Sequence, residues 1–270
     1  MKKARVLFVA QEITPYLEET SMSRIGRYLP QGIQEKGKEI RTFMPRFGHI
    51  NERRNQLHEV IRLSGMNLII NDSDHPLIIK VASIQQARMQ VYFIDNEEYF
   101  HKKITFREKS GKFCEDNDER AIFFARGVLE TVKKLGWAPD IIHCHGWFTG
   151  LVPLYVKKLF KDNPIFSESK IVFSAYDDQF EEKFNPNFVN KLSLDGIDGE
   201  DIDLYKEGDY QSILKGAISF SDAAIIGNEN VNEDIKSFVE NSGKPYLGYQ
   251  DEESYISAYN DLYDQILSES

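Results

Sequence analysis

The sequence predicts a single doubly wound α/β domain, in which helices cover both faces of a mainly parallel sheet. Short apolar runs rich in β-branched residues alternate with segments of helical periodicity along most of the 270 residues. A strand, a helix and a second strand follow one another near the amino terminus, which is the βαβ unit of parallel sheets. One later stretch breaks this alternation and has the pattern of a small β-hairpin insertion.

The βαβ unit begins with an apolar run between polar residues, which is typical of a buried strand. Thr20, Ser21 and Ser23 are alternative caps for the helix that follows, and Gly37 ends it. The expected elements are a strand at Arg5–Ala10, a helix running to Glu35 and a strand at Glu39–Met44.

The hairpin insertion is expected between Val60 and Ile94, where turn residues such as those at 71–74 separate three strand-like runs. These runs are Leu68–Ile70, Leu77–Val81 and Met89–Ile94. The last of them should return to the main sheet.

The remaining segments alternate again. We expect helices from Asn117, over Thr149–Phe160, Tyr210–Phe220 and Val231–Glu240, and strands at Asp140–Cys144, Lys170–Ala175, Ala223–Ile226 and Pro245–Tyr249. A polar stretch over residues 177–209 should hold a loop with short helical turns.

The chain closes with a wide apolar stripe on a helix expected over Glu252–Leu267. The stripe consists of Tyr255, Ile256, Tyr259, Leu262, Tyr263, Ile266 and Leu267. Because such a stripe must be covered, we divide the chain into a domain over residues 1–250 and a C-terminal helix over residues 251–270 that docks on it.

Charge and composition argue against several functions. The net charge of −10, from 33 basic and 43 acidic residues, argues against nucleic-acid binding through a basic surface, although a local positive cleft stays compatible with an anionic ligand. No run approaches the roughly 20 apolar residues of a membrane span. The first apolar run leads into Gln11–Glu12 and not into a cleavage site. Cys114 and Cys144 give no disulfide framework, so we expect a cytoplasmic protein.

Ligands of open parallel sheets bind outside the carboxyl ends of the strands. Four segments of this chain should lie there, namely Gln11–Ser23, His143–Gly150, Tyr176–Asp177 and Gly227–Glu229.

His143–Gly150 is the densest of these segments in functional side chains. His143 and His145 stand two apart on a strand and point the same way, but no third ligand motif is nearby, so we expect no metal and no cofactor. His145 is a candidate for a hydrogen bond to a ligand. Trp147 is either a packing anchor or a platform for a sugar ring, and Thr149 either caps a helix or receives a phosphate or hydroxyl at its start.

Short motifs follow one another in order along nearly the whole chain. They include Val6–Glu12 with Pro15, Gly26 with Leu29–Pro30, Met44–Phe47, Val91–Phe100, Asp118–Arg120 with Phe123–Arg126, Pro139–His145, Trp147, Thr149–Pro153 and, more loosely, Leu214–Gly216 before Ser221–Asp222. In this the chain resembles the N-terminal domain of glycogen and starch synthases, the ADP-glucose-dependent glucosyltransferases of glycosyltransferase family 5. The resemblance implies one Rossmann-like half of a GT-B fold and, for the family, transfer of glucose from ADP-glucose to an α-1,4-glucan.

The resemblance is weakest at the loop after the first strand. The family's loop reads Lys-Thr-Gly-Gly-Leu-Ala-Asp, and its lysine and backbone amides meet the nucleotide sugar. Here Glu18 stands at the lysine position, Thr20 and Ser21 stand at the two glycines, and Arg24 stands at the aspartate. A carboxylate beside a diphosphate turns attraction into repulsion.

Among the later loops, His145 alone matches a family active-site residue, and the resemblance implies a catalytic role for it. Tyr176–Asp177 stands where the family has a His-Asn pair. The resemblance and the edge geometry together give a candidate substrate site of Glu12, Glu18, Thr20, Ser21, Trp147, Thr149, Tyr176 and Asp177.

The family enzymes close a second domain over the donor, whereas this sequence ends at Ser270, where the first domain should finish. We therefore expect a pseudoenzyme that is inactive alone. The alternatives are a non-catalytic regulatory module that binds a glucan or a partner protein, and one half of a split glucosyltransferase. The implied partners are an α-glucan or ADP-glucose, and a separately encoded C-terminal glycosyltransferase domain or a second copy of the chain, with no nucleic acid and no membrane.

Overall fold

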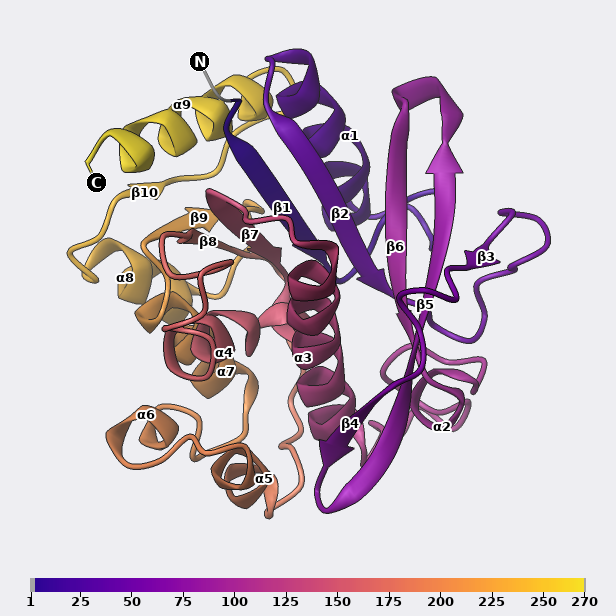
Figure 1. Ribbon diagram of the computed structural model, residues 1–270. Helices are drawn as coiled ribbons and strands as arrows, with labels where there is room; N and C mark the ends of the chain where they lie inside the picture. The colour runs from indigo at the N-terminus through magenta and orange to yellow at the C-terminus, as the bar shows by residue number, and fades with distance from the viewer. Residues whose placement is uncertain (1–2, 270) are drawn as a thin grey trace.

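The computed structural model describes residues 3–269, which fold into a mixed sheet with helices on both faces (Figure 1). The predicted bounds at residues 1 and 270 lie outside this range. The strands are β1 (Arg5–Ala10), β2 (Glu39–Pro45), β3 (His58–Glu59), β4 (Met66–Ile70), β5 (Ser73–Ile84), β6 (Met89–Asp95), β7 (Ile141–His145), β8 (Lys170–Ala175), β9 (Ala223–Ile226) and β10 (Tyr246–Leu247).

The strand order is β10-β9-β8-β7-β1-β2-β6-β5-β3, and β4 pairs with β5 outside this path. All neighbours from β10 to β6 are parallel, with β1 at the centre between β7 and β2. β5 runs antiparallel to β6, β3 and β4. The predicted doubly wound, mainly parallel sheet with a hairpin insertion is therefore confirmed.

Nine α-helices connect the strands of residues 3–269. They are α1 (Ser21–Glu35), α2 (Glu97–Phe100), α3 (Asn117–Leu135), α4 (Val152–Lys158), α5 (Phe188–Leu194), α6 (Glu200–Asp203), α7 (Tyr210–Ser219), α8 (Glu233–Glu240) and α9 (Tyr255–Ser268). Two 3-10 turns, at Gln85–Ala87 and Trp147–Thr149, complete the connections.

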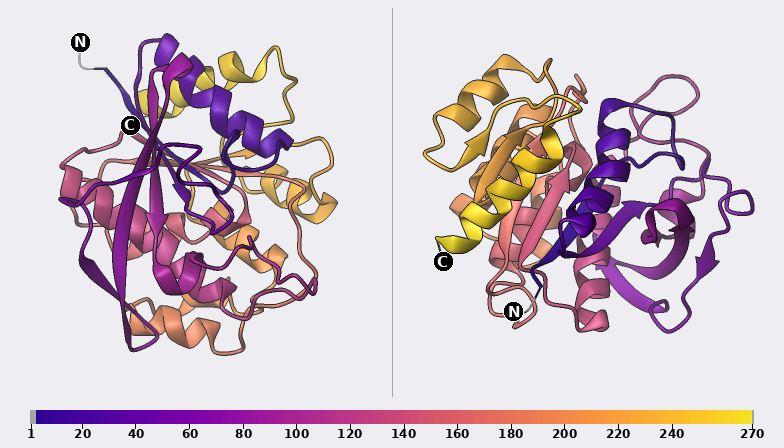
Figure 2. Two further views of the ribbon diagram at one scale, coloured as in Figure 1. Left: turned by 90° about the vertical axis from the view of Figure 1, so that its right-hand side faces the viewer. Right: turned by 90° about the horizontal axis from the view of Figure 1, so that it is seen from above.

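Alternate residues of each strand feed two separate cores, as the pleat of a β-strand requires. On β1, Leu7 and Val9 face the core under α3, α4 and α7, whereas Val6 and Phe8 face the core under α1 and α9. Both ends of the chain thus meet on one face, where α1 and α9 lie next to each other (Figure 2).

α9 covers β1, β7, β8 and β9 with its apolar stripe. Tyr259, Leu262, Tyr263 and Ile266 are each at most 3% exposed. Burying each such side chain stabilises the fold by roughly 1.5–3 kcal/mol. α9 also approaches α1 closely, because a Cβ added at Gly32 would lie 2.6 Å from Ile256 Cγ2.

The prediction that a helix begins at Thr149 is wrong, because α4 begins only at Val152. The preceding residues form a 3-10 turn in which the Thr149 hydroxyl donates to the Gly146 carbonyl at 2.8 Å. Thr149 therefore closes a turn and does not cap α4. Over residues 3–269, the helices include none with the length and apolar character that crossing a membrane requires.

Candidate functional site

The carboxyl ends of β1, β7 and β8 meet at a closely packed point around Gly146. Gln11, directly after β1, donates its backbone N–H to the His145 carbonyl at 3.2 Å, and its Oε1 accepts from the Phe148 N–H at 2.9 Å. Gly146 has φ +86°, and a Cβ there would lie 2.7 Å from Gln11 Oε1 and 2.9 Å from Met22 Sδ. Glycine is required here both by backbone conformation and by space.

His145 lies below this point and is 1% exposed. Its Nδ1 hydrogen-bonds the Tyr176 hydroxyl at 2.8 Å, and its Nε2 has no partner among the described residues. Burial lowers the pKa of His145 to about 3, so the ring is neutral at physiological pH. A neutral ring with one free nitrogen can accept or donate one hydrogen bond, but it cannot supply a positive charge.

His143 packs against His145 with 3.8 Å between the ring centroids and the two ring planes tilted by 36°. Its Nε2 hydrogen-bonds Ser174 Oγ at 2.7 Å, and its Nδ1 hydrogen-bonds the hydroxyl of Tyr263 on α9. Burial, together with the neighbouring His145, lowers the pKa of His143 well below its usual value. Both ring nitrogens are used in packing the sheet against α9, which gives His143 a structural role.

Carboxylates gather at the surface of the same edge. Glu12 Oε2 accepts a hydrogen bond from Thr20 Oγ1 at 2.7 Å, and burial, with the negative charge of Asp177, raises the pKa of Glu12. Asp178 accepts from the Trp147 N–H at 3.0 Å and from the Tyr210 hydroxyl at 3.1 Å. Burial, with a contribution from Glu12, raises the pKa of Asp178 to about 6.

Sequence reasoning missed Asp178, although it follows Tyr176–Asp177 directly. Asp177 is exposed, whereas Asp178 turns inward beneath Trp147 and Tyr210. The available signal was the pair of adjacent aspartates after a buried strand.

The first loop is organised as a helix start. Thr20 caps α1 by accepting from the Ser23 N–H at 3.0 Å, while Ser23 Oγ accepts from the Thr20 N–H at 2.8 Å. Ser21 Oγ accepts from Asn228 Nδ2 at 3.0 Å and so links α1 to the loop after β9. The sequence offered Thr20, Ser21 and Ser23 as alternative caps of α1, and in the structure Thr20 is the N-cap residue.

Glu18 lies apart from the other carboxylates. Its side chain is exposed. Burial lowers the pKa of the nearby His49, and the negative charge of Glu18 opposes this shift by raising the pKa. The Glu18 carbonyl accepts from Ser23 Oγ at 3.1 Å. The structure therefore brings together Glu12, Thr20, Ser21 and Asp177, with His145 and Tyr176 behind them, and leaves Glu18 to one side.

Trp147 and Thr149 face inward. Trp147 is 3% exposed and packs among five phenylalanines, with ring centroids 4.6 Å from Phe106 and 4.8 Å from Phe180. Thr149 is fully buried. This packing matches the anchor interpretation of Trp147, while substrate contact by either residue stays a prediction.

A cavity of about 330 Å³ adjoins this edge between α1, the loop after β9 and the start of α9. It is lined by Ser21, Arg24, Ile25, Tyr28, Gly227, Tyr249, Gln250, Glu252, Tyr255 and Ile256. Tyr28 and Tyr249 are each 46% exposed, and Arg24 is paired with Glu252 at 3.0 Å and with Glu19 at 3.4 Å. The cavity is thus aromatic and polar, with its arginine already neutralised.

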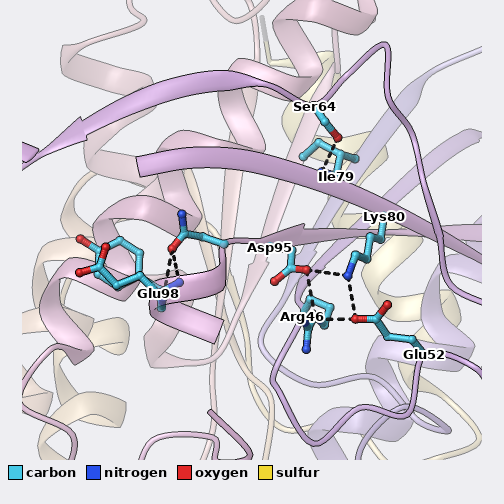
Figure 3. Close-up of polar contacts among 9 residues, drawn as sticks. Arg46, Glu52, Ser64, Ile79, Lys80, Asp95 and Glu98 are labelled. Atoms are coloured by element: carbon cyan, nitrogen blue, oxygen red, sulfur yellow. Dashed lines mark hydrogen bonds and ion pairs between the residues drawn. The ribbon is translucent and has the colours of Figure 1, made fainter. Parts of the chain in front are cut away.

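Further along the same edge, after β2 and β6, lies an ion cluster (Figure 3). Asp95 accepts from Arg46 Nε and Lys80 Nζ, both at 3.0 Å. Glu52 pairs with the same two cations, at 3.2 Å from Arg46 and 2.7 Å from Lys80. Two carboxylates balance two cations, so the cluster leaves no net positive charge for a phosphate.

The comparisons with known proteins agree with this architecture. The family model described as the starch synthase catalytic domain matches residues 5–245. The chain belongs to this starch synthase catalytic-domain family. The resemblance found in the sequence motifs is therefore confirmed, and the family carries the glycosyltransferase and glycogen or starch synthase description.

Curated relatives of the family support the assignment. A glycogen synthase of Chlorobaculum parvum is 33% identical over 240 residues, covering 88% of this chain and 48% of its own length. A glycogen synthase of Chlorobium limicola is 39% identical over 173 residues, covering 64% of this chain and 35% of its own. The chain thus spans between about a third and half of these relatives.

One solved structure confirms the fold. The catalytic domain of starch synthase IV from Arabidopsis thaliana, bound to ADP and acarbose, superposes with a TM-score of 0.72 at 19% identity. The match covers 93% of this chain and 52% of that structure.

Proposed function

We propose that this chain is a glycogen-synthase-type domain that binds an α-glucan at the carboxyl edge of its sheet and does not, by itself, transfer glucose from ADP-glucose. The observation that carries the proposal is the set of carboxylates at that edge. Glu12, Asp177 and Asp178 gather where the family's sugar nucleotide would be expected.

A diphosphate would meet repulsion there. Two unit charges about 4 Å apart interact by roughly 4 kcal/mol near a protein surface. Arg24, in the adjoining cavity, is held by Glu19 and Glu252, and the Arg46–Lys80 cluster is balanced by two carboxylates. The cations of these two groups are therefore already paired with carboxylates.

Catalysis also needs positive electrostatics. Glycosyl transfer with a diphosphate leaving group is accelerated chiefly by groups that stabilise the developing negative charge. His145 is neutral, and its free Nε2 is buried beneath the Gly146 turn. His145 therefore does not supply the charge that the transition state requires, which supports inactivity of the chain alone.

A neutral glucan fits the edge better. Carboxylates accept hydrogen bonds from sugar hydroxyls, and exposed tyrosines provide an apolar ring face with a polar tip. Tyr28 and Tyr249 stand at the mouth of the adjoining cavity. This supports acceptor-side binding as the function of the site.

Calorimetric titration of the 270-residue chain with maltoheptaose and with ADP-glucose tests the proposal. We expect maltoheptaose to bind and ADP-glucose not to bind, and no labelled glucose to pass from ADP-glucose to glycogen. Tyr249→Ala should weaken maltoheptaose binding by about tenfold, since an aromatic contact is worth roughly 1–1.5 kcal/mol.

Tyr246→Ala is the matched control. Tyr246 is 44% exposed, close to the 46% of Tyr249, but it lies on β10 outside the cavity. Glucose transfer by the chain alone would overturn the inactive assignment. Equal loss in both tyrosine variants would overturn the glucan site.

A further inference from the structure

A second cleft lies at the opposite end of the sheet, where β2 and β6 begin. It has a volume of about 760 Å³, within the range of small-molecule sites. It is lined by Lys3, Gln34, Lys38, Glu39, Ile40, Arg41, Ser83, Ile84, Gln85, Arg88, Met89, Gln90 and Tyr92. The start of β2 and the turn from β5 to β6 lie at this same end of the molecule (Figure 1).

The cleft is positively charged in a protein whose net charge is −10. Four cations line it, against the single carboxylate of Glu39. Glu39 is already engaged, because it accepts from Trp137 Nε1 at 2.5 Å and pairs with Arg5 at 3.3 Å. Lys38 pairs with Asp264 of α9 at 2.7 Å, which leaves three unpaired cations.

These three cations are Lys3, Arg41 and Arg88, none of which lies within ion-pair distance of a carboxylate in the 3–269 range, although the charge of Arg41 also acts on Glu39. In a protein with more acidic than basic residues, unpaired cations that converge on one cleft are not expected from charge balance. An anion seated there would neutralise them. This cleft is a local region of positive charge of the kind that the negative net charge of the sequence does not exclude.

Arg41 is held in place before any ligand arrives. Its guanidinium lies 5.2 Å from the ring centroid of Trp137 and 5.8 Å from that of Tyr92, and one amino group donates to the Tyr92 hydroxyl at 2.7 Å. Its Nε is buried and makes no hydrogen bond within the described structure. A buried donor without an acceptor is costly, so the guanidinium of Arg41 keeps hydrogen-bonding capacity that no described residue uses.

Arg88 reaches the cleft from a strained turn. It has φ +50°, a left-handed conformation that side chains other than glycine and asparagine rarely adopt. Its N–H donates to the Gln85 carbonyl at 3.1 Å and closes the 3-10 turn before β6. Such strain concentrates at binding sites, where the fold over-determines the position of one side chain.

We propose that this cleft binds a small organic phosphate whose ring carries hydroxyl groups. The cations supply charge-assisted hydrogen bonds to the phosphate. Gln34, Gln85, Gln90 and Ser83 offer paired donors and acceptors for hydroxyls. Ile40 and Met89 form the apolar part of the lining that a ring needs. The proposal does not depend on glucan binding at the carboxyl edge.

Two methionines allow both ends of the sheet to be watched in one experiment. Met89 lines the cationic cleft, and Met22 lies at the carboxyl edge beside Gly146. In a methyl-labelled NMR titration of the full chain, glucose 1-phosphate should shift the Met89 signal and leave Met22 unmoved. Inorganic phosphate should act more weakly at Met89, and uncharged glucose should not act there.

The variant Lys3→Gln/Arg88→Gln removes two exposed cations and should raise the dissociation constant for glucose 1-phosphate about tenfold or more. Arg53→Gln/Arg54→Gln removes the same charge from two exposed arginines outside the cleft and should leave binding unchanged. A static Met89 signal, equal weakening in both variants, or a shift at Met22 instead would each overturn the proposal. A maltoheptaose shift at Met22 bears only on the proposed function, so the two can fail separately.

Discussion

The two ends of the sheet differ in charge and in packing. At the carboxyl end, Gln11, Met22 and Asp178 crowd around Gly146, and the neighbouring ionisable groups are the carboxylates of Glu12 and Asp177. At the amino end, the strands begin around an open cleft lined by cations, three of them unpaired within residues 3–269. Ligands of doubly wound folds bind at the carboxyl end of the sheet, whereas the cationic cleft proposed here for a phosphate lies at the amino end.

This difference shows that a chain can keep the fold of its family while its side chains decide which ligands the site can bind. The family fold, the strand order and the turn at Gly146 are all in place, whereas the ionisable groups nearest that turn are carboxylates. Function resides in the site and not in the scaffold.

The largest effect is expected from Gly146→Ala. Gly146 has φ +86° and ψ 162°, a region essentially restricted to glycine, and an added Cβ would lie 2.7 Å from Gln11 Oε1. We expect a loss of about 3 kcal/mol in the free energy of unfolding, measured in urea. Gly136→Ala is the control, since φ is +60° there with no atom near the new Cβ. It should cost about 1 kcal/mol, and equal losses would contradict tight packing at Gly146.

An intermediate effect is expected from the pH dependence of stability. The pKa of Asp178 is raised by burial from its ordinary value of 3.8 to about 6, so the folded state binds more protons than the unfolded state between these values. Stability contributed by this group should therefore rise as the pH falls from 7 through 6 towards 4. The resulting change in the free energy of unfolding is of order 1–3 kcal/mol.

Asp178→Asn isolates this contribution. The difference in unfolding free energy between the wild type and the variant should shift in favour of the wild type as the pH falls from 7 to 5. Glu12, whose pKa is also raised, remains in both proteins, so the difference reports the titration of Asp178 together with its coupling to Glu12. A difference that is constant over this range would show that Asp178 titrates normally.

The sequence predicted elements well wherever one local pattern decided the structure. The apolar stripe of α9, the periodicity of α3 and the run that forms β1 each depend on neighbouring residues, and their places match the structure within a few residues. Thr149 was misplaced because a hydroxyl that can cap a helix can equally close a 3-10 turn. No local signal separates these two uses.

The charged sites could not be predicted in the same way. Asp178 owes its raised pKa to burial, which outweighs the lowering effect of hydrogen bonds from Trp147 and Tyr210, and both donors are distant in sequence. Lys3, Arg41 and Arg88 are far apart along the chain and line one cleft only when the fold brings the start of β2 beside the start of β6. Both features arise from the parallel pairing of strands, which sequence spacing does not encode.

The smallest effect concerns the carboxylates themselves. Glu12→Gln/Asp177→Asn removes two negative charges from the carboxyl edge while keeping the hydrogen bond from Thr20 available to residue 12. If repulsion is what excludes a diphosphate, the double variant should gain weak, salt-sensitive ADP-glucose binding, detected as a shift of the Met22 methyl signal. The gain should be modest, because removing repulsion does not add the missing cation.

Asp162→Asn/Glu240→Gln is the control variant. It removes two exposed carboxylates elsewhere and should gain no ADP-glucose binding. If both double variants stay inert towards ADP-glucose, the closed packing around Gly146, and not charge, is what excludes the nucleotide.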